Sequence, residues 1–216
     1  DVFTTSELAS NLLELNVIPS KLDIGKLANE WNEEQSSYSD QKEFLLKKLS
    51  VLEENQDQPV EPRDVVLYGF GRIGRLAARE LIKQAGKGQQ LRLRAIVTRS
   101  SKDADIIKRA SLLRNDSVHG AFKGSVIEDL EKKTLVINGQ IVHMISANAP
   151  EDIDYTAYGI NNALVIDNTG VFTNREALSR HLSAKGTAKV LLTAPGKEIP
   201  NIVYGINQGE LDLENE

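Results

Sequence analysis

Apolar positions along residues 63–216 alternate between short continuous runs and longer stretches with helical spacing. Short runs rich in Val, Leu and Ile predict buried strands, and they occupy residues 65–68, 91–97, 124–127, 135–137, 141–144, 164–166 and 190–192. Apolar residues three and four apart predict helices, which cover residues 76–82, 103–113 and 175–185. Strands that alternate with helices are typical of an α/β fold with a mostly parallel sheet.

One pair of these runs is joined by Asn138-Gly139. Both residue types tolerate positive φ, which the two-residue turn of a hairpin requires. The dipeptide therefore predicts an antiparallel hairpin within the otherwise parallel sheet.

The first part of the chain has a different pattern. Leucines at helical spacing, with Trp31 among them, predict three short helices between residues 1 and 57. Each helix follows a Ser, Thr or Asp that has an acid three residues later, and these capping pairs are Thr4 with Glu7, Ser20 with Asp23 and Asp40 with Glu43. Such helices suit either an appendage that packs on itself or on the main body, or a docking module for a partner or sister subunit.

Charge and glycine content divide the chain near Arg63. Residues 1–62 hold 13 acids, five lysines and one glycine, whereas residues 63–216 hold 21 basic and 18 acidic residues and 14 glycines. The polar stretch before the boundary carries Pro59 and Pro62, and proline disfavours helix at the residue before it. We expect a helical extension over 1–57, a linker over 58–62 and one α/β domain over 63–216.

Composition narrows the chemistry that this chain can perform. The net charge of −5 argues against nucleic-acid binding through a basic field, and no apolar run approaches the length of a membrane-spanning helix. The 216 residues contain no cysteine, which excludes disulfides, thiolate metal sites and cysteine nucleophiles within them. None of the three histidines has a second ligand at metal-binding spacing, so we expect no metal site.

A glycine-rich loop follows the first predicted strand and opens the next helix. Its sequence, Gly69-Phe70-Gly71-Arg72-Ile73-Gly74, fits G-x-G-x-x-G. The first glycine permits a tight turn, the second lets the backbone approach a pyrophosphate, and the third allows close packing of helix on strand. The phosphates would lie at the helix N-terminus, where free N–H groups and the helix dipole favour an anion. The loop therefore predicts dinucleotide binding.

Four segments in order, this loop included, resemble the glyceraldehyde-3-phosphate dehydrogenase family. The loop is followed by Asn115-Asp116-Ser117-Val118-His119-Gly120, by Asp167-Asn168-Thr169-Gly170-Val171-Phe172-Thr173, and by Leu192–Lys197 ahead of Tyr204-Gly205-Ile206-Asn207. The resemblance covers roughly residues 63–210, and residues 1–62 fall outside it.

The resemblance implies a Rossmann-type domain that binds NAD or NADP, preceded here by the helical extension. It implies a phosphorylating oxidation of glyceraldehyde 3-phosphate to an acyl phosphate, in a cytoplasmic homotetramer. It also implies contacts with the dinucleotide, which we expect from Gly69, Phe70, Gly71, Arg72, Ile73, Gly74, Asn148, Thr169, Gly170 and Thr193. The two threonines would otherwise be ordinary residues at strand ends.

The chain departs from the family pattern at several points. Tyr68 stands where the family usually carries an asparagine, and Asn148 stands where it usually has an arginine near the adenine. The family's nucleophile is a cysteine in a Ser-Cys-Thr-Thr-Asn run, and this chain has no cysteine. The family's catalytic histidine also lies further downstream. We therefore expect no catalytic residue in these 216 residues, and a chain that is inactive alone.

The residues after the second strand bear on the choice of cofactor. NAD-selective proteins usually place an acid there to bind the ribose hydroxyls. No acid lies between Glu80 and Asp103, and Arg99 or Ser100 occupies that place. A guanidinium there would favour the 2′-phosphate of NADP. Alternatively, Arg99 points to solvent or pairs with Asp103 or Asp105.

Two other functions remain open from the sequence. A sister aldehyde dehydrogenase, such as the erythrose-4-phosphate enzyme, would share the same cofactor domain. A non-catalytic dinucleotide sensor or scaffold would use the domain to gate a protein partner of residues 1–57.

Overall fold

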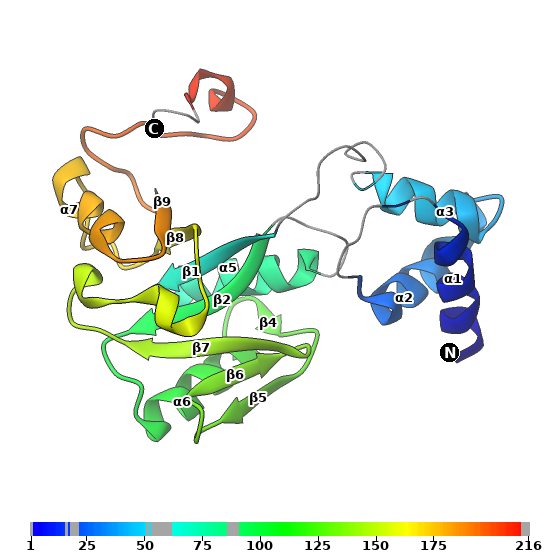
Figure 1. Ribbon diagram of the computed structural model, residues 1–216, viewed down its shortest axis with the longest axis horizontal. Coiled ribbons are helices and arrows are strands. Elements are labelled where there is room, and N and C mark those ends of the chain that lie inside the picture. Colours follow the sequence, from blue (N-terminus) through cyan, green and yellow to red (C-terminus); the bar gives the residue numbers. More distant parts are fainter. Residues whose placement is uncertain are drawn as a thin grey trace. The chain divides into compact units, whose positions relative to one another are not determined.

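The computed structural model describes residues 2–15, 17, 22–50, 52, 62–85 and 91–212. The chain forms two compact units: residues 1–62 together with 83–92, and residues 63–82 together with 93–216. Figure 1 shows α1, α2 and α3 in the first unit and a sheet flanked by helices in the second.

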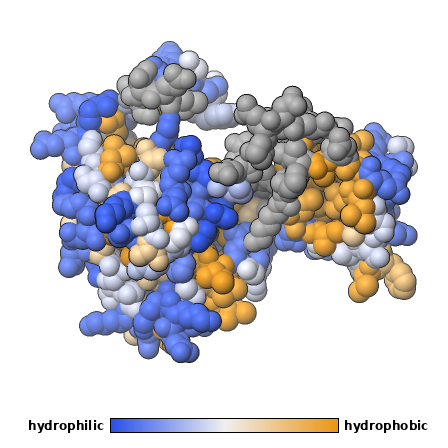
Figure 2. All heavy atoms as spheres, in the orientation of Figure 1, coloured by the Kyte–Doolittle hydropathy of each residue, from blue (hydrophilic) through white to orange (hydrophobic). Residues whose placement is uncertain are grey.

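The first unit contains α1 (Val2–Glu14), α2 (Ile24–Glu34) and α3 (Gln41–Lys48), with a 3₁₀ turn, η1, at Gln35–Ser37. In the part of the chain that the structure describes, the fully or nearly fully buried residues of its core are Leu8, Leu27, Ala28, Phe44, Leu45, Leu49 and Leu52. The rings of Trp31 and Tyr38 pack edge-on against the Phe44 ring, with distances between ring centroids of 5.3 and 5.2 Å. Figure 2 shows hydrophobic residues gathered on this unit, where Phe3 and Leu13 are largely exposed.

Only part of the predicted helix capping is correct. Asp40 accepts a hydrogen bond from the Glu43 backbone N–H at 2.8 Å, as predicted for the start of α3. The predicted cap at Thr4 is wrong, because α1 already runs from Val2. In α2 the cap is Asp23, whose carboxylate accepts from Lys26 N–H at 2.9 Å, whereas Ser20 lies outside the described residues. The N–H groups of the first helical turn have no partner within the helix, and a side-chain oxygen just before that turn can accept from them. A residue can therefore cap a helix only if it lies directly before the first turn.

The second unit is built on a seven-stranded sheet in the order β5-β6-β7-β2-β1-β8-β9. The strands are β1 (Arg63–Tyr68), β2 (Leu91–Thr98), β5 (Val126–Asp129), β6 (Thr134–Ile137), β7 (Gln140–Ser146), β8 (Ala163–Asp167) and β9 (Thr187–Leu192). β7 is parallel to β2, and β8 is parallel to both β1 and β9. β6 is antiparallel to both of its neighbours, β5 and β7. This is the mostly parallel α/β sheet that the sequence predicts.

Helices cover the two faces of the sheet because alternate residues of each strand point to opposite sides. In β1, Val65 and Leu67 pack on one side with residues of α5 (Arg72–Gln84) and α6 (Asp103–Arg114). Val66 and Tyr68 pack on the other side with Leu178 of α7 (Arg175–Ser179). The second side also carries the 3₁₀ turns η2 (Pro150–Asp152), η3 (Tyr155–Tyr158) and η4 (Arg180–Ser183). The remaining elements are the small β3 (Asn115–Asp116) and β4 (Gly120–Ala121) pair and η5 (Gln208–Glu210).

The predicted hairpin turn is confirmed and the last predicted helix is too long. Asn138 and Gly139 have φ of 46° and 78°, and they join β6 to β7 with Ile137 opposite Gln140. The helix predicted over 175–185 stops being α-helical after Ser179 and tightens into η4. His181 in this turn is buried in the core, so tertiary contacts accompany the change from the predicted helical pattern.

Two expectations concern parts of the chain that the structure describes incompletely. Most of the predicted linker over 58–62 lies outside the described residues. Among the residues that are described, no helix is long and apolar enough to cross a membrane.

Candidate functional site

The candidate site lies where the order of the strands reverses. From β1 the chain passes to β2 and β7 on one side, and later returns to β8 on the other side of β1. In the β1–β8 register, Tyr68 lies opposite Asp167, so the loops that begin at Gly69 and Asn168 leave neighbouring strand ends. In open α/β sheets, ligands bind in the crevice at such a switch point, beyond the carboxyl ends of the strands.

Two glycines of the loop after β1 are required by the protein's own packing. Gly69 has a φ of +91°, and a Cβ there would lie 2.8 Å from Thr169 Cγ2. A Cβ on Gly74 would lie 2.3 Å from the carbonyl oxygen of Gly69. Such distances are shorter than real Cβ contacts, so these glycines let strand, loop and helix α5 approach one another.

Gly71 has no such structural reason to be glycine. A Cβ built on it would meet no atom within 4 Å, and its backbone is outside the left-handed region. It is exposed, as are Arg72 and Ile73, which open helix α5. A glycine that the fold does not need fits a backbone that an outside group must approach closely, next to the N–H groups of a helix N-terminus. These residues therefore fit the pyrophosphate of a dinucleotide.

Phe70 anchors the loop rather than lining it with its side chain. The phenyl ring is 3% exposed and belongs to the core beneath α5 and α6. Its carbonyl oxygen accepts a hydrogen bond from Arg109 Nη1 at 3.4 Å. Burial lowers the pKa of Arg109 from its ordinary value. The loop therefore starts from a fixed base, and Gly71, Arg72 and Ile73 follow it as exposed residues.

The loop after β8 is held by Asp167, the last residue of that strand. Asp167 is fully buried, and its Oδ1 accepts hydrogen bonds from Thr169 N–H and Thr169 Oγ1, each at 2.8 Å. Thr193, after β9, donates its backbone N–H to the Asp167 carbonyl oxygen at 3.0 Å. Gly170 has a φ of +69° and open space around its Cα. The structure thus brings Thr169, Gly170 and Thr193 together at the edge where the glycine loop lies.

Arg99, Ser100 and Asn148 lie beyond the ends of two parallel neighbours, β2 and β7, where Thr98 is opposite Ser146. Arg99 is exposed and forms no ion pair with another residue in the described part of the chain. The alternative partners are engaged elsewhere, because Asp103 pairs with Lys133 and the Asp105 carboxylate accepts a hydrogen bond from Ser100 Oγ. Asn148 is exposed on the neighbouring loop.

Asp116, in the Asn115–Gly120 segment, is a structural anchor for helix α5. Its Oδ1 accepts from the backbone N–H groups of Val118 and His119, both at 3.0 Å, and Oδ2 accepts from Arg75 Nη2 at 3.2 Å. The His119 ring, 3.0 Å away, is the largest contribution that lowers the pKa of Asp116 well below its usual range. These bonds fix the first turn of α5 to the β3–β4 hairpin.

Sequence reasoning missed two functional candidates, Asp167 and His181. An acid that directly follows the apolar run 164–166 and precedes Thr169 was a signal for Asp167. Nothing in the sequence pattern marked His181 as a candidate, because its contact with Asp167 forms only in the folded structure. In the described ranges, no three His, Asp or Glu side chains gather as a metal ion would require.

Comparison with known proteins identifies similar sequences. Residues 63–175 match the family described as glyceraldehyde 3-phosphate dehydrogenase, NAD binding domain. A glyceraldehyde-3-phosphate dehydrogenase-like protein of Pseudomonas aeruginosa is 44% identical over 99% of this chain and 47% of its own length. Glyceraldehyde-3-phosphate dehydrogenases of Zymomonas mobilis and Streptococcus pyogenes are 35% and 34% identical, over 70% and 68% of this chain and 42% and 41% of their own lengths.

These matches differ in extent. The match to the Pseudomonas protein also includes the N-terminal helices, which lie before residue 63 and outside the four segments that resemble the family. The chain spans less than half the length of each of these relatives.

Gly71→Ala tests whether a ligand approaches the backbone at this glycine. We expect an unchanged melting temperature, because the new methyl group meets no protein atom, and roughly tenfold weaker NAD binding, because it occupies the space of the ligand. Calorimetric titration with NAD and a thermal melt measure both quantities. Gly209→Ala is the matched control, since Gly209 also has open space and an ordinary φ. Unchanged affinity in Gly71→Ala would show that no ligand approaches this backbone.

Asp116→Asn tests the anchor through its pH dependence. The folded pKa of Asp116 is lowered, so its contribution to stability is present above the unfolded value of about 3.9 and is lost as the pH falls through the folded pKa. We expect the variant to melt below the wild type at pH 7, with a gap that narrows below about pH 4. Melts across this range measure it, with the exposed Glu131→Gln as control. A gap that is independent of pH would contradict the account.

Proposed function

This chain belongs to the glyceraldehyde-3-phosphate dehydrogenase family, and we propose that it is the NAD(P)-binding portion of a phosphorylating enzyme of that family. The full-length protein would oxidise glyceraldehyde 3-phosphate to an acyl phosphate with inorganic phosphate. The observation that carries the proposal is Gly71, a glycine that the fold does not require, in an exposed loop at the switch point of the sheet. The names of the relatives favour this function over a sister aldehyde dehydrogenase or a sensor.

Different residues of the chain are assigned to different parts of the dinucleotide. We assign the pyrophosphate to the backbone N–H groups of residues 70–73, since they lie at the start of α5. We assign the path from adenosine to nicotinamide to Thr169, Gly170 and Thr193, because Asp167 holds them together. Asn148 would lie on the adenine side. When bound, the nicotinamide ring would accept the hydride that leaves the substrate as its aldehyde carbon is oxidised.

The chemistry at the aldehyde needs a group that these residues do not contain. The resemblance implies a cysteine thiolate as nucleophile, and the 216 residues have no cysteine. We therefore assign cofactor binding to this chain and covalent chemistry to residues outside it. By family relationship, we propose a cytoplasmic homotetramer for the full-length protein.

One pair of assays tests this division. The purified 216-residue chain should bind NAD or NADP in calorimetry at concentrations up to about 1 mM, and should produce no NAD(P)H from glyceraldehyde 3-phosphate and phosphate. The full-length protein should produce it, with a rate that depends on phosphate. Turnover by the chain alone, or failure of the full-length protein to oxidise this aldehyde, would contradict the proposal.

Arg99 is proposed to select the cofactor. A guanidinium about 4 Å from a 2′-phosphate gains about 4 kcal/mol at an effective dielectric of about 20, which solvent exposure reduces to about 1–2 kcal/mol. We expect NADP to bind at least as tightly as NAD, and Arg99→Asp to weaken NADP roughly tenfold with a smaller effect on NAD. Calorimetry with both dinucleotides decides this, with the exposed Arg175→Asp as control. Equal effects of Arg99→Asp on both would mean that Arg99 is not the selector.

Residues 1–57 are proposed to be a separate helical extension joined by a linker at 58–62. Among the residues that the structure describes, the buried residues of the helices come from positions 8–52 and those of the sheet unit from position 65 onward, so no described residue belongs to both cores. We expect a chain that begins at Pro62 to melt cooperatively and to bind dinucleotide as the 216-residue chain does. Insolubility or loss of a cooperative transition in this truncated chain would contradict separate folding. We propose that residues 1–57 bind a protein partner.

A further inference from the structure

A buried acid and a buried histidine lie directly behind the candidate site. Asp167 ends β8 and is fully buried, and His181 in η4 is 1% exposed. His181 Nε2 lies 3.0 Å from Asp167 Oδ2. Charged and polar groups at this depth are costly unless they are hydrogen-bonded, so the pair depends on its own contacts.

The two oxygens of Asp167 serve different partners. Oδ2 faces His181, while Oδ1 accepts both bonds from Thr169, through its backbone N–H and its hydroxyl. Thr169 Oγ1 in turn accepts a hydrogen bond from Val171 N–H at 3.1 Å. A single carboxylate therefore links η4 to the loop that carries Thr169 and Gly170.

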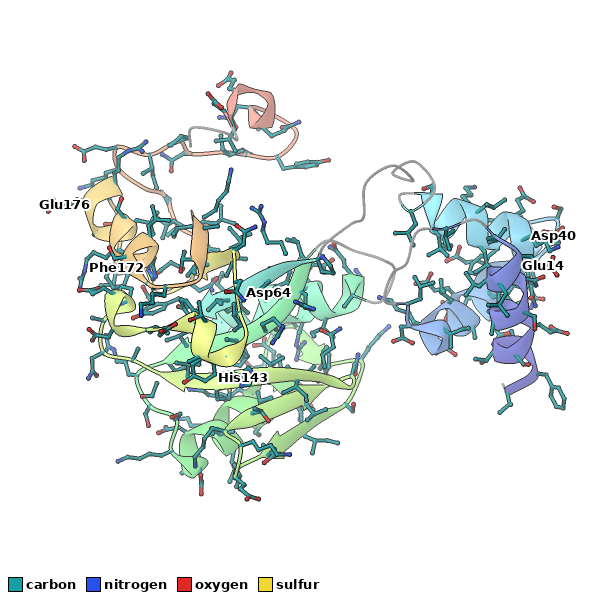
Figure 3. All side chains as sticks on the ribbon, in the orientation of Figure 1. Glu14, Asp40, Asp64, His143, Phe172 and Glu176 are labelled. Atoms are coloured by element: carbon teal, nitrogen blue, oxygen red, sulfur yellow. The ribbon has the colours of Figure 1, made fainter. Side chains whose placement is uncertain are left out.

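The environment of the imidazole fixes which nitrogen makes this contact. His181 Nδ1 is buried and has no hydrogen-bond partner among the described residues. The rings of Tyr68 and Phe172 pack edge-on against the imidazole, with distances between ring centroids of 4.6 and 5.1 Å. Phe172 is labelled in Figure 3. Nε2–H thus donates to the carboxylate, and aromatic packing holds the ring in that orientation.

We propose that His181 is a positioning residue for dinucleotide binding, acting through Asp167 on Thr169. Its N–H holds Oδ2, so that Oδ1 keeps facing Thr169 and the loop keeps its turn. The loop has little freedom to move without affecting the glycine loop, since Gly69 lies directly against Thr169. This inference rests on the proposed function, because it assigns a role in the same dinucleotide site.

Paired substitutions separate the hydrogen bond from packing. His181→Phe keeps an aromatic ring beside Tyr68 and Phe172 but removes the donor. His181→Gln supplies a side-chain N–H in place of the imidazole N–H. We expect His181→Phe to weaken NAD and NADP binding about tenfold, and His181→Gln to restore most of the affinity. A role in packing alone predicts the opposite order, with His181→Phe the better-tolerated variant.

A second readout does not depend on binding. Amide hydrogen exchange at Thr169 and Gly170, measured without dinucleotide, should be faster in His181→Phe than in the wild type and near wild-type in His181→Gln. His143→Phe is the matched control, since His143 is a half-buried histidine of β7 outside the proposed site, and it should change neither quantity. If His181→Phe does not fold, His181→Leu replaces it as the variant without a donor.

The outcomes distinguish this inference from the proposed function. Unchanged affinity and unchanged exchange in a folded His181→Phe chain would overturn the positioning role, with dinucleotide binding itself intact. Loss of affinity in both His181 variants without faster exchange at Thr169 would also overturn it. If the wild-type chain binds neither dinucleotide, the proposed function fails, and the exchange at Thr169 alone decides whether His181 holds the loop.

Discussion

The close approach of the loops after β1 and β8 is the constraint on which the rest of the site depends. Gly69 lies against Thr169 and Gly74 lies against the carbonyl of Gly69, at distances that leave no room for a Cβ. Each loop therefore sets the path of the other, and helix α5 starts where the two meet. Because β1 and β8 run parallel and their ends are in register, this contact forms at the switch point, where an α/β sheet binds its ligand.

Buried polar groups keep these loops in place from below. The Asp167 carboxylate accepts hydrogen bonds from three donors in two segments, and Asp116 ties Arg75 of α5 to the β3–β4 hairpin. Arg109 holds the carbonyl side of the glycine loop. With these contacts satisfied inward, the glycine loop leaves the open face of Gly71 exposed at the start of α5, an arrangement that suits an anionic dinucleotide.

The sequence predicted the elements well where local chemistry decides them. Apolar runs located the strands, and Asn138-Gly139 predicted its turn because few other residue pairs adopt two positive φ values. Predictions failed where a contact distant in sequence decides the outcome. The helix after Arg175 gives way to η4 after Ser179, and His181 of η4 is buried in the core. The cap prediction at Thr4 failed for a local reason, because α1 already runs from Val2. The glycine loop could be recognised from spacing, whereas the Asp167–His181 pair joins residues that only the folded sheet brings together.

The central claim is that a dinucleotide binds between the loops after β1 and β8, and amide chemical shifts test it most directly. The ¹⁵N-labelled chain is titrated with NAD and, separately, with NADP, and the shift of each backbone amide is followed. The account predicts the largest, saturable changes at Phe70 to Ile73 and at Thr169 and Gly170. Saturable changes confined to the helices of residues 1–57, or no saturable change at either loop, would contradict it.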